Sequence, residues 1–159
     1  MNVRALAGRP GVSDRGKPSK FAEAAEWTGG FADGDDAGAR FRCPGGVCEA
    51  QDGTLYVSDA YNHCIRKRAP GAAAWTTLCG RPGEKGVADG QGEAARLSYP
   101  QRIALDASGN LVVAGGGSHA LHLVTPVGAV RYCNPHGVAC ELTRGVACSC
   151  LAPHAHEAF

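Results

Sequence analysis

Three observations in the sequence predict an all-β fold. Gly (23) and Pro (9) together make 32 of the 159 residues, roughly a fifth of the chain against a usual share of about 12%. A long stretch of the chain is repeated at a constant offset of 56 residues. Each copy consists of short apolar runs separated by turn residues, a pattern typical of strands and not of amphipathic helices.

The repeat is clearest between residues 30–44, GFADGDDAGARFRCP, and residues 86–100, GVADGQGEAARLSYP. These two segments align without a gap. The same offset relates further apolar and turn residues, pairing Val47 with Ile103, Gly53 with Gly109, Leu55 with Leu111, Val57 with Val113 and Pro70 with Pro126. A constant offset over so many positions indicates two copies of one structural unit.

Each copy divides into four short strands. Asp52-Gly53 is a favoured tight-turn pair, and the run Leu55-Tyr56-Val57 that follows it has high β propensity. The predicted strands are 47–50, 54–57, 65–67 and 73–78 in the first copy, and 103–106, 110–114, 121–124 and 129–132 in the second. A four-stranded antiparallel meander of this size is one blade of a β-propeller.

Fragments of the same unit flank the two copies. Residues 6–11 (LAGRPG) are similar to residues 78–83 (LCGRPG), and residues 135–139 are similar to residues 44–48. We therefore divide the chain into the end of a preceding blade with an extended connector (1–28), a first blade (29–82), a degenerate second blade (83–133), and the start of a third blade with a divergent Cys/His tail (134–159).

The chain resembles the NHL-repeat family of β-propellers. The resemblance is carried by the connector GFADGDDAGARF with its following Pro44, by the hairpin DGTLYVSDAYNHCIRK at residues 52–67, and by the closing run TTLCG at residues 76–80. It implies a noncatalytic scaffold for protein-protein interaction. Two alternatives implied by related propellers are an enzyme of the lactonase or lyase type with a central metal, and an RNA-binding module.

Several polar residues of the hairpin are interpreted as structural residues, here called fasteners, whose side chains stabilise the turn and the hairpin. Asp59 closes a strand, and we expect it to accept hydrogen bonds from backbone N–H groups of the turn that Asn62 helps to form. The two histidines occupy one repeat position, which favours a role in the turn over catalysis. The set of fasteners is Asp59, Asn62, His63, Arg66 and His119. The second copy has Gly115, Ser118 and His122 at the positions of Asp59, Asn62 and Arg66, so we expect that blade to be less firmly held.

The two connectors, residues 30–42 and 86–96, are the predicted binding loops because they are polar, rich in turn residues and repeated. Their candidate binding residues are Asp33, Asp35, Arg40, Asp89 and Arg96, although the two arginines suit a bracing role better. The run Asp33-Gly34-Asp35-Asp36 resembles the opening of a calcium loop. The second copy loses the extra carboxylates and no downstream Glu completes the motif, so a turn is the favoured interpretation.

No metal or other cofactor is expected. The tail contains zinc-ligand residue types at Cys148, Cys150, His154 and His156, but one residue separates the two cysteines where structural zinc sites have two to four. The chain has no Gly-x-Ser-x-Gly motif. Cys64 beside His63 is no catalytic dyad, because adjacent strand residues point to opposite faces.

Charge and size indicate the kind of partner. Sixteen basic and fifteen acidic residues give a net charge of +1, which favours a protein partner over RNA. No apolar run reaches the about 18 residues of a membrane span or the core of a signal peptide, so we expect an intracellular, cytoplasmic protein with reduced cysteines. Propellers use about 4–8 blades, so we expect a fragment of a larger propeller. Assembly of several copies through open sheet edges and an incomplete propeller that folds alone are the alternatives.

Overall fold

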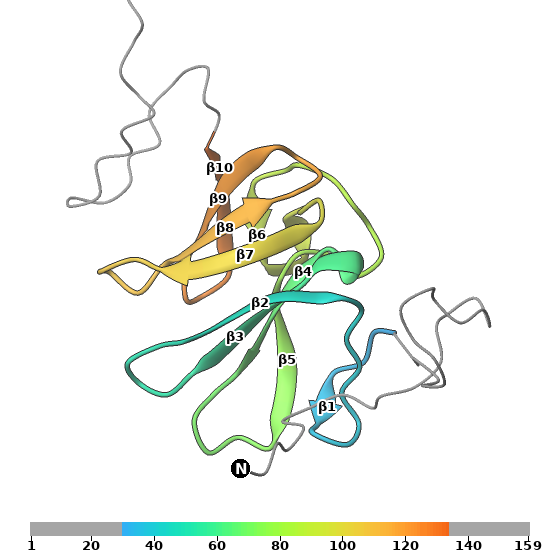
Figure 1. Cartoon of the computed structure of the whole chain (residues 1–159), viewed down its shortest axis with the longest axis vertical. Helices are drawn as coiled ribbons and strands as arrows, with labels where there is room; N and C mark the ends of the chain where they lie inside the picture. The colour runs from blue at the N-terminus through green and yellow to red at the C-terminus, as the bar shows by residue number, and fades with distance from the viewer. Residues whose placement is uncertain (1–29, 134–159) are drawn as a thin grey trace, which may run out of the picture.

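The computed structural model describes residues 30–133, which form two antiparallel sheets of five strands each (Figure 1). The first sheet has the order β1-β5-β4-β3-β2 and contains β1 (Gly34–Asp35), β2 (Pro44–Glu49), β3 (Leu55–Asp59), β4 (Cys64–Arg68) and β5 (Ala74–Cys79). The second sheet has the order β6-β10-β9-β8-β7 and contains β6 (Gly90–Gln91), β7 (Pro100–Leu105), β8 (Leu111–Gly115), β9 (Ala120–Val124) and β10 (Ala129–Cys133). Each sheet is a propeller blade, so the predicted fold class is confirmed and the chain is an incomplete propeller.

All eight predicted strands are present, and each blade gains a fifth strand that the sequence did not predict. Residues of the connectors form these strands: Gly34 pairs with Trp75 of β5, and Gly90 pairs with Val130 of β10. A two-residue strand is too short to show a period-2 hydrophobic pattern. Each connector therefore covers part of the outer edge of the blade that it leads into.

Two single-turn 3-10 helices, η1 (Ala60–Asn62) and η2 (Gly92–Ala94), are the helical elements within residues 30–133, and no helix there is long and apolar enough to cross a membrane. His63 ends η1 with φ 59°, and His119 has φ 52° at the same repeat position. Positive φ is uncommon outside glycine, and histidine is among the residues that tolerate it. Both histidines thus lie in turns, as the repeat predicts.

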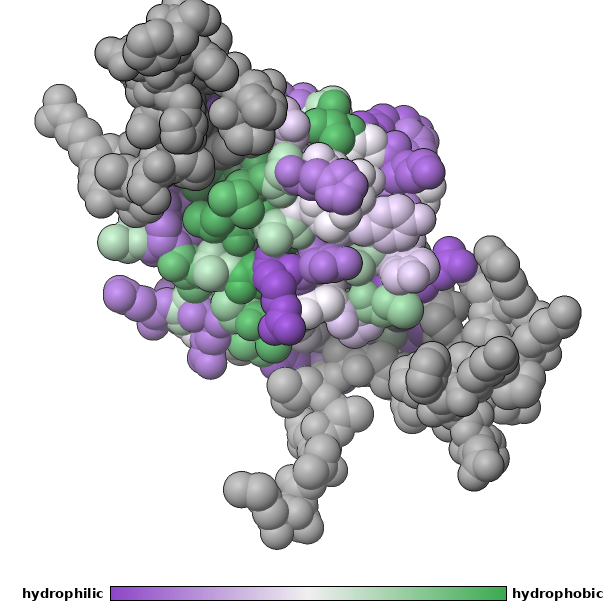
Figure 2. Space-filling model, turned by 45° about the horizontal axis from the view of Figure 1, so that its top comes forward, coloured by the Kyte–Doolittle hydropathy of each residue, from purple (hydrophilic) through white to green (hydrophobic). Residues whose placement is uncertain are grey.

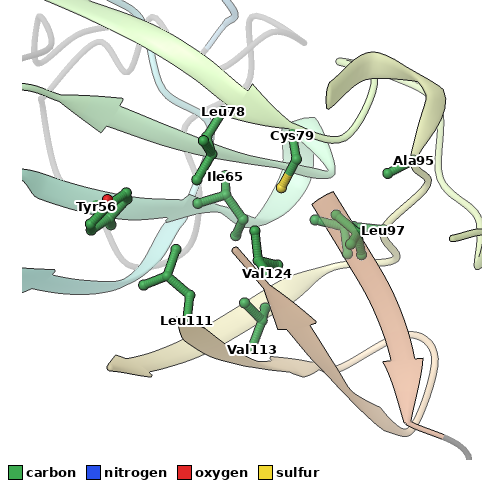
Figure 3. Close-up of a cluster of buried hydrophobic side chains, with 10 residues drawn as sticks. Tyr56, Ile65, Leu78, Cys79, Ala95, Leu97, Leu111, Val113 and Val124 are labelled. Atoms are coloured by element: carbon green, nitrogen blue, oxygen red, sulfur yellow. The ribbon is translucent and has the colours of Figure 1, made fainter. Parts of the chain in front are cut away.

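The main hydrophobic core lies between the two blades (Figure 3). The side chains that the first blade contributes are Tyr56, Ile65, Leu78 and Cys79, and the second blade and its connector contribute Ala95, Leu97, Leu111, Val113, Val124 and Val130. Burying a large aliphatic side chain contributes about 1.5–3 kcal/mol relative to leaving it in water. The two blades consequently stabilise each other, because each covers the hydrophobic side chains that the other contributes to this core.

The innermost strands of the two blades approach closely at Gly46. A Cβ atom on this residue would lie 2.8 Å from the carbonyl oxygen of Gln101 and 3.1 Å from the backbone nitrogen of Ile103. These are backbone atoms, so they cannot swing away as a side chain can. The Ser58 hydroxyl donates a hydrogen bond to the same Gln101 carbonyl. Glycine is therefore required where β2 meets β7.

Within residues 30–133 the connector strands cover part of each outer sheet edge, and association of copies through open sheet edges stays a prediction. β1 and β6 pair with the outer strands β5 and β10, and propeller blades meet through their faces. Leu121 is 40% exposed, although Ile65 at the same repeat position is fully buried. Figure 2 shows a surface on which hydrophobic residues gather between hydrophilic ones. The predictions for residues 1–28 and 134–159 lie outside the described residues.

Candidate functional site

Arg66 is the centre of a buried polar cluster in the first blade. It lies on β4, is fully buried, and its Nη1 donates to Asp59 Oδ2 at 3.2 Å while its Nη2 donates to Asp33 Oδ1 at 2.6 Å. Two more donations go to the carbonyls of Arg40 and Ala32 in the connector, at 3.0 and 2.8 Å. The guanidinium carbon also lies 4.8 Å from the ring centroids of Phe31 and Phe41. One side chain thus joins the hairpin to the connector.

Asp59 links the same two segments from the other side. Its Oδ1 accepts a hydrogen bond from the backbone N–H of Arg42 at 2.7 Å, and its Oδ2 accepts one from Asn62 Nδ2 at 2.8 Å. Asn62 also donates to the Gly30 carbonyl at 2.8 Å. Burial raises the pKa of Asp59 to about 6, against the opposing effects of Asn62, the Arg42 backbone and Arg66.

The backbone partner of Asp59 differs from the prediction. The sequence led us to expect backbone donors within the turn of Asn62, but the N–H of His63 in that turn is already bonded to the Ala60 carbonyl. The carboxylate instead reaches the connector seventeen residues earlier, at Arg42. Its role is therefore to hold two segments together and not only to close its own turn.

The candidate binding residues of the first connector have intramolecular partners. Asp33 accepts hydrogen bonds from the backbone N–H of Thr77 at 3.2 Å as well as from Arg66. Asp35 Oδ1 accepts from the Gly38 N–H at 2.6 Å. Arg40 Nη1 donates to three carbonyls of its own turn, those of Ala37, Gly38 and Ala39. These contacts support the bracing interpretation.

The second connector repeats this arrangement. Arg96 Nη1 donates to the carbonyls of Glu93 and Ala95, and its Nη2 lies 3.1 Å from Glu84 Oε2. Asp89 Oδ1 accepts from the backbone N–H of Tyr132 at 2.6 Å, as Asp33 does from Thr77. Asp33 and Asp89 therefore share one role, which is to tie the connector to the outer strand of the blade.

The calcium-like run does not converge on one point. Asp33 faces Arg66 and Asp35 faces its own turn, while Asp36 Oδ1 accepts from Arg68 Nη1 at 2.8 Å and from Trp75 Nε1 at 3.2 Å. Within residues 30–133 no group of three or more His, Cys, Asp or Glu side chains could hold a metal ion. The zinc candidates Cys148, Cys150, His154 and His156 lie outside the described residues.

The second blade replaces the ionic cluster with a neutral pair. His122, at the position of Arg66, is buried, and its Nε2 lies 3.0 Å from the Ser118 hydroxyl. Its Nδ1 has no hydrogen-bond partner. Burial lowers the pKa of His122, with Asp89 opposing, so the ring is neutral at pH 7. The hydroxyl also donates to the Gly115 carbonyl at 3.2 Å.

An aromatic and basic surface at the hairpin turn was not predicted from the sequence. We call it the turn-end patch and define it as Arg42, Tyr61, His63, Lys85 and Tyr99, of which Tyr61 and Lys85 are exposed and His63 is buried beneath the tyrosines. The Tyr99 ring meets those of Tyr61 and His63 edge to face, at centroid distances of 5.3 and 4.5 Å. The guanidinium carbon of Arg42 lies 6.0 Å from the Tyr61 centroid. Tyr61 is 49% exposed.

The fold brings the patch together from four separate segments. The Tyr61 N–H donates to the Arg42 carbonyl at 3.0 Å, and the Tyr99 N–H donates to His63 Nδ1 at 3.2 Å. A backbone hydrogen bond of 3.2 Å from Gly83 to Asn62 lays the loop that carries Lys85 over the same turn. Tyr61 and Tyr99 have Gly117 and Cys43 as their repeat counterparts, so a search for shared positions overlooks them. The signal in the sequence that could have indicated this surface is Tyr61, a large aromatic residue in a predicted turn.

Comparison with known proteins agrees with this architecture. Residues 41–67 match the family model described as the NHL repeat. Over 86 residues the chain is 41% identical to Protein SUPPRESSOR OF QUENCHING 1, chloroplastic, from Arabidopsis thaliana, a match that covers 53% of this chain and 8% of that protein. The chain thus corresponds to a small part of that relative.

Two solved structures show the same fold. A protein of unknown function from Bacteroides thetaiotaomicron has a TM-score of 0.58 and 24% identity, over 80% of this chain and 31% of that one. An auxiliary nutrient binding protein from Bacteroides ovatus has a TM-score of 0.55 and 22% identity, over 69% and 27%. The fold and the repeat together define an incomplete β-propeller. The chain carries the NHL repeat, and the predicted resemblance to that family is confirmed.

Proposed function

We propose that this chain is a noncatalytic NHL-type β-propeller scaffold for protein-protein interaction, with the turn-end patch as its contact surface. The patch carries the proposal because tyrosine and arginine are enriched at interfaces and among their energetic hot spots. Hydrogen bonds fix the backbone of the patch: the Arg42 N–H donates to Asp59, and the Tyr61 N–H donates to the Arg42 carbonyl. A surface held in place before binding loses less conformational entropy on association.

The Ser118–His122 pair is the arrangement among the described residues closest to a catalytic one, and its surroundings support a noncatalytic role. An acyl-transfer site needs N–H donors aimed at the developing oxyanion. The neighbouring N–H groups of Gly116, Gly117 and Ser118 are already bonded to the carbonyls of Tyr99, Ser98 and Gly115. Among the described residues, these neighbouring N–H groups are therefore not free to stabilise an oxyanion beside the hydroxyl and the imidazole.

A scaffold role also fits a module of a longer protein, since the match to the Arabidopsis thaliana protein covers 8% of its length. That protein is named as chloroplastic. Our expectation of a cytoplasmic, intracellular location stays a prediction, as does the expectation that the chain is a fragment.

The test is affinity capture from a nuclease-treated extract of the native cells, with partners identified by mass spectrometry. Tyr61→Ala removes an exposed ring of the patch, and Val127→Ala is the matched control, because Val127 is 72% exposed on a turn of the second blade. We expect proteins that bind the wild type and Val127→Ala but are lost with Tyr61→Ala. If the captured proteins bind both variants as well as the wild type, the proposed contact surface is wrong.

The enzyme alternative requires a separate assay. Lactone and ester hydrolysis is measured with and without added divalent cations, and with Ser118→Ala. We expect no turnover above the rate without protein. Turnover that Ser118→Ala or a chelator abolishes would contradict the noncatalytic proposal.

A further inference from the structure

We infer that copies of this chain associate head to tail, with the second blade of one copy packing on the first blade of the next. The contact uses two sheet faces that point away from the contact between the two blades of one chain. The upstream face, on the first blade, is defined by Phe41, Val47, Leu55, Val57 and Trp75, and the downstream face, on the second blade, by Val112, Ala114, Leu121 and Leu123. These faces are distinct from the turn-end patch, so the inference goes beyond the proposed function.

The alternation of side chains along the strands places these residues. Val57 belongs to a hydrophobic cluster separate from the core between the blades, and Val47 pairs with it across β2 and β3. Val113 lies in the core between the blades. Its neighbour Val112 therefore lies on the opposite face, with Leu123 as its cross-strand partner.

The downstream face is a copy of the surface that the first blade already uses. In the contact between the blades, the first blade contributes Tyr56 and Ile65 to the core (Figure 3). Their repeat counterparts in the second blade are Val112 and Leu121. Ile65 is fully buried and Leu121 is 40% exposed, while Tyr56 is buried and Val112 is half-buried. The second blade thus repeats the apolar pattern of a blade contact without its burial.

The upstream face is likewise a copy of the surface that receives the first blade. In the second blade, Leu111 lies in the core between the blades and Ile103 packs against it. Their counterparts in the first blade are Leu55 and Val47. Leu111 is fully buried and Leu55 half-buried, while Ile103 is half-buried and Val47 is 65% exposed. The two faces are therefore the two halves of one blade contact, and a second copy supplies the matching half to each.

The inner strands admit this contact at a wider spacing. Within the chain, Gly46 of β2 lets the backbone approach Gln101. Between copies, Arg102 takes the place of Gly46. The β2 strand that it meets has glycine at positions 45 and 46, so that strand presents no side chains of its own against the arginine. The net charge of +1 also leaves little long-range repulsion between copies.

Sedimentation velocity of the full chain between about 1 μM and 1 mM measures the association. We expect the average mass to rise with concentration. Val47→Glu and Leu121→Glu each place a carboxylate without a partner in the contact, so each should weaken association by about tenfold or more. Val127→Glu is the matched control, because Val127 is 72% exposed on a turn of the second blade, and it should associate as the wild type does. Circular dichroism establishes that each variant is folded.

An equimolar mixture of the two face variants tests the direction of the contact. Val47→Glu keeps an intact downstream face and Leu121→Glu keeps an intact upstream face, so one copy of each should form a 1:1 heterodimer in native mass spectrometry. Growth should stop there, because both remaining faces carry a glutamate. A contact between like faces would instead let one of the variants dimerise by itself.

Four outcomes overturn the inference: a wild type that stays monomeric over the whole range, a mixture without the heterodimer, dimerisation of one face variant by itself, or equal association of Leu121→Glu and Val127→Glu. A monomeric wild type would mean that the chain itself covers the two faces or leaves them in solvent. The capture experiment with Tyr61→Ala tests the proposed function separately, and its result does not depend on these outcomes.

Discussion

The two blades share strand order and register but differ in the polar side chains buried in their hairpins. The first blade has a buried ionic cluster around Arg66 that reaches the connector, whereas the second has the neutral Ser118–His122 pair, whose hydrogen bonds stay within residues 115–122. What they keep in common is the tie from Asp33 or Asp89 to the outer strand and the apolar strand faces. A blade therefore requires the apolar pattern, and the ionic cluster is an addition that fixes the loop beneath the turn-end patch.

The blades also differ at the surface that faces the next blade. The first blade has Gly46 where its inner strand passes β7, while the second has the exposed Arg102 at that repeat position. Ile65 is fully buried and its counterpart Leu121 is 40% exposed. The arginine occupies a place where the packing between these two blades admits only glycine. A further blade packed on the second with the same close approach would therefore have to accommodate the Arg102 side chain.

Substitution of the central arginine should have the largest effect on this comparison. Arg66→Met leaves Asp59 buried without its cation, and breaking a buried pair in this way costs about 3–5 kcal/mol. His122→Leu in the second blade removes a ring whose Nδ1 is unpartnered, and the Ser118 hydroxyl keeps its bond to Gly115. We expect its cost to be about 1 kcal/mol or less. Urea denaturation measures both free energies of unfolding, and equal costs would contradict the distinction between the blades.

Acidification should change the contributions of Asp59 in the first blade and of His122 in the second to the free energy of unfolding in opposite directions. The folded pKa of Asp59 is about 6 and its unfolded value about 3.9, so the folded state binds the proton more tightly. Between pH 7 and about 4 the contribution of Asp59 to the free energy of unfolding should rise, by about 2–3 kcal/mol. The lowered pKa of His122 acts oppositely: its contribution is complete above about pH 6.5 and falls as the pH drops.

The measurement is urea denaturation at several pH values of the wild type, Asp59→Asn and His122→Leu. The stability of the wild type relative to Asp59→Asn should increase on acidification, whereas its stability relative to His122→Leu should decrease. A decrease relative to Asp59→Asn would mean that Arg66 keeps the carboxylate ionised well below pH 6.

The repeated strands and turns of this fold were predictable from the sequence. The contacts between residues far apart in the sequence were not. Strands such as β3 and β8 follow from apolar residues at a constant offset, and the turn positions of His63 and His119 follow from the repeat itself. The bond from Asp59 to Arg42, and the meeting of Tyr61 with Tyr99, join residues far apart in sequence. Nothing in local propensity encodes such pairs, because they depend on how the connector crosses the blade.

The close approach of the inner strands provides the next test. Gly46→Ala places a methyl group 2.8 Å from the Gln101 carbonyl oxygen, and overpacking of this kind costs about 1–3 kcal/mol. Arg102, at the matching position of the second blade, is exposed. Arg102→Ala should therefore change the free energy of unfolding by about 0.5 kcal/mol or less. Thermal unfolding compares the two variants. A similar loss in both would show that the packing between β2 and β7 tolerates a side chain.

The smallest expected effect concerns the place where the second blade lost its aspartate. A Cβ atom on Gly115 would overlap the Ser118 hydroxyl and lie 2.9 Å from His122 Nε2. Gly115→Ala should therefore push the hydroxyl away from the imidazole and cost about 1 kcal/mol, the net worth of one hydrogen bond. In a Ser118→Ala background that bond is already absent, so the same Gly115→Ala change should cost clearly less. A double-mutant cycle by urea denaturation measures the coupling, and additive losses would mean that Gly115 is required by the backbone and not by the neutral pair.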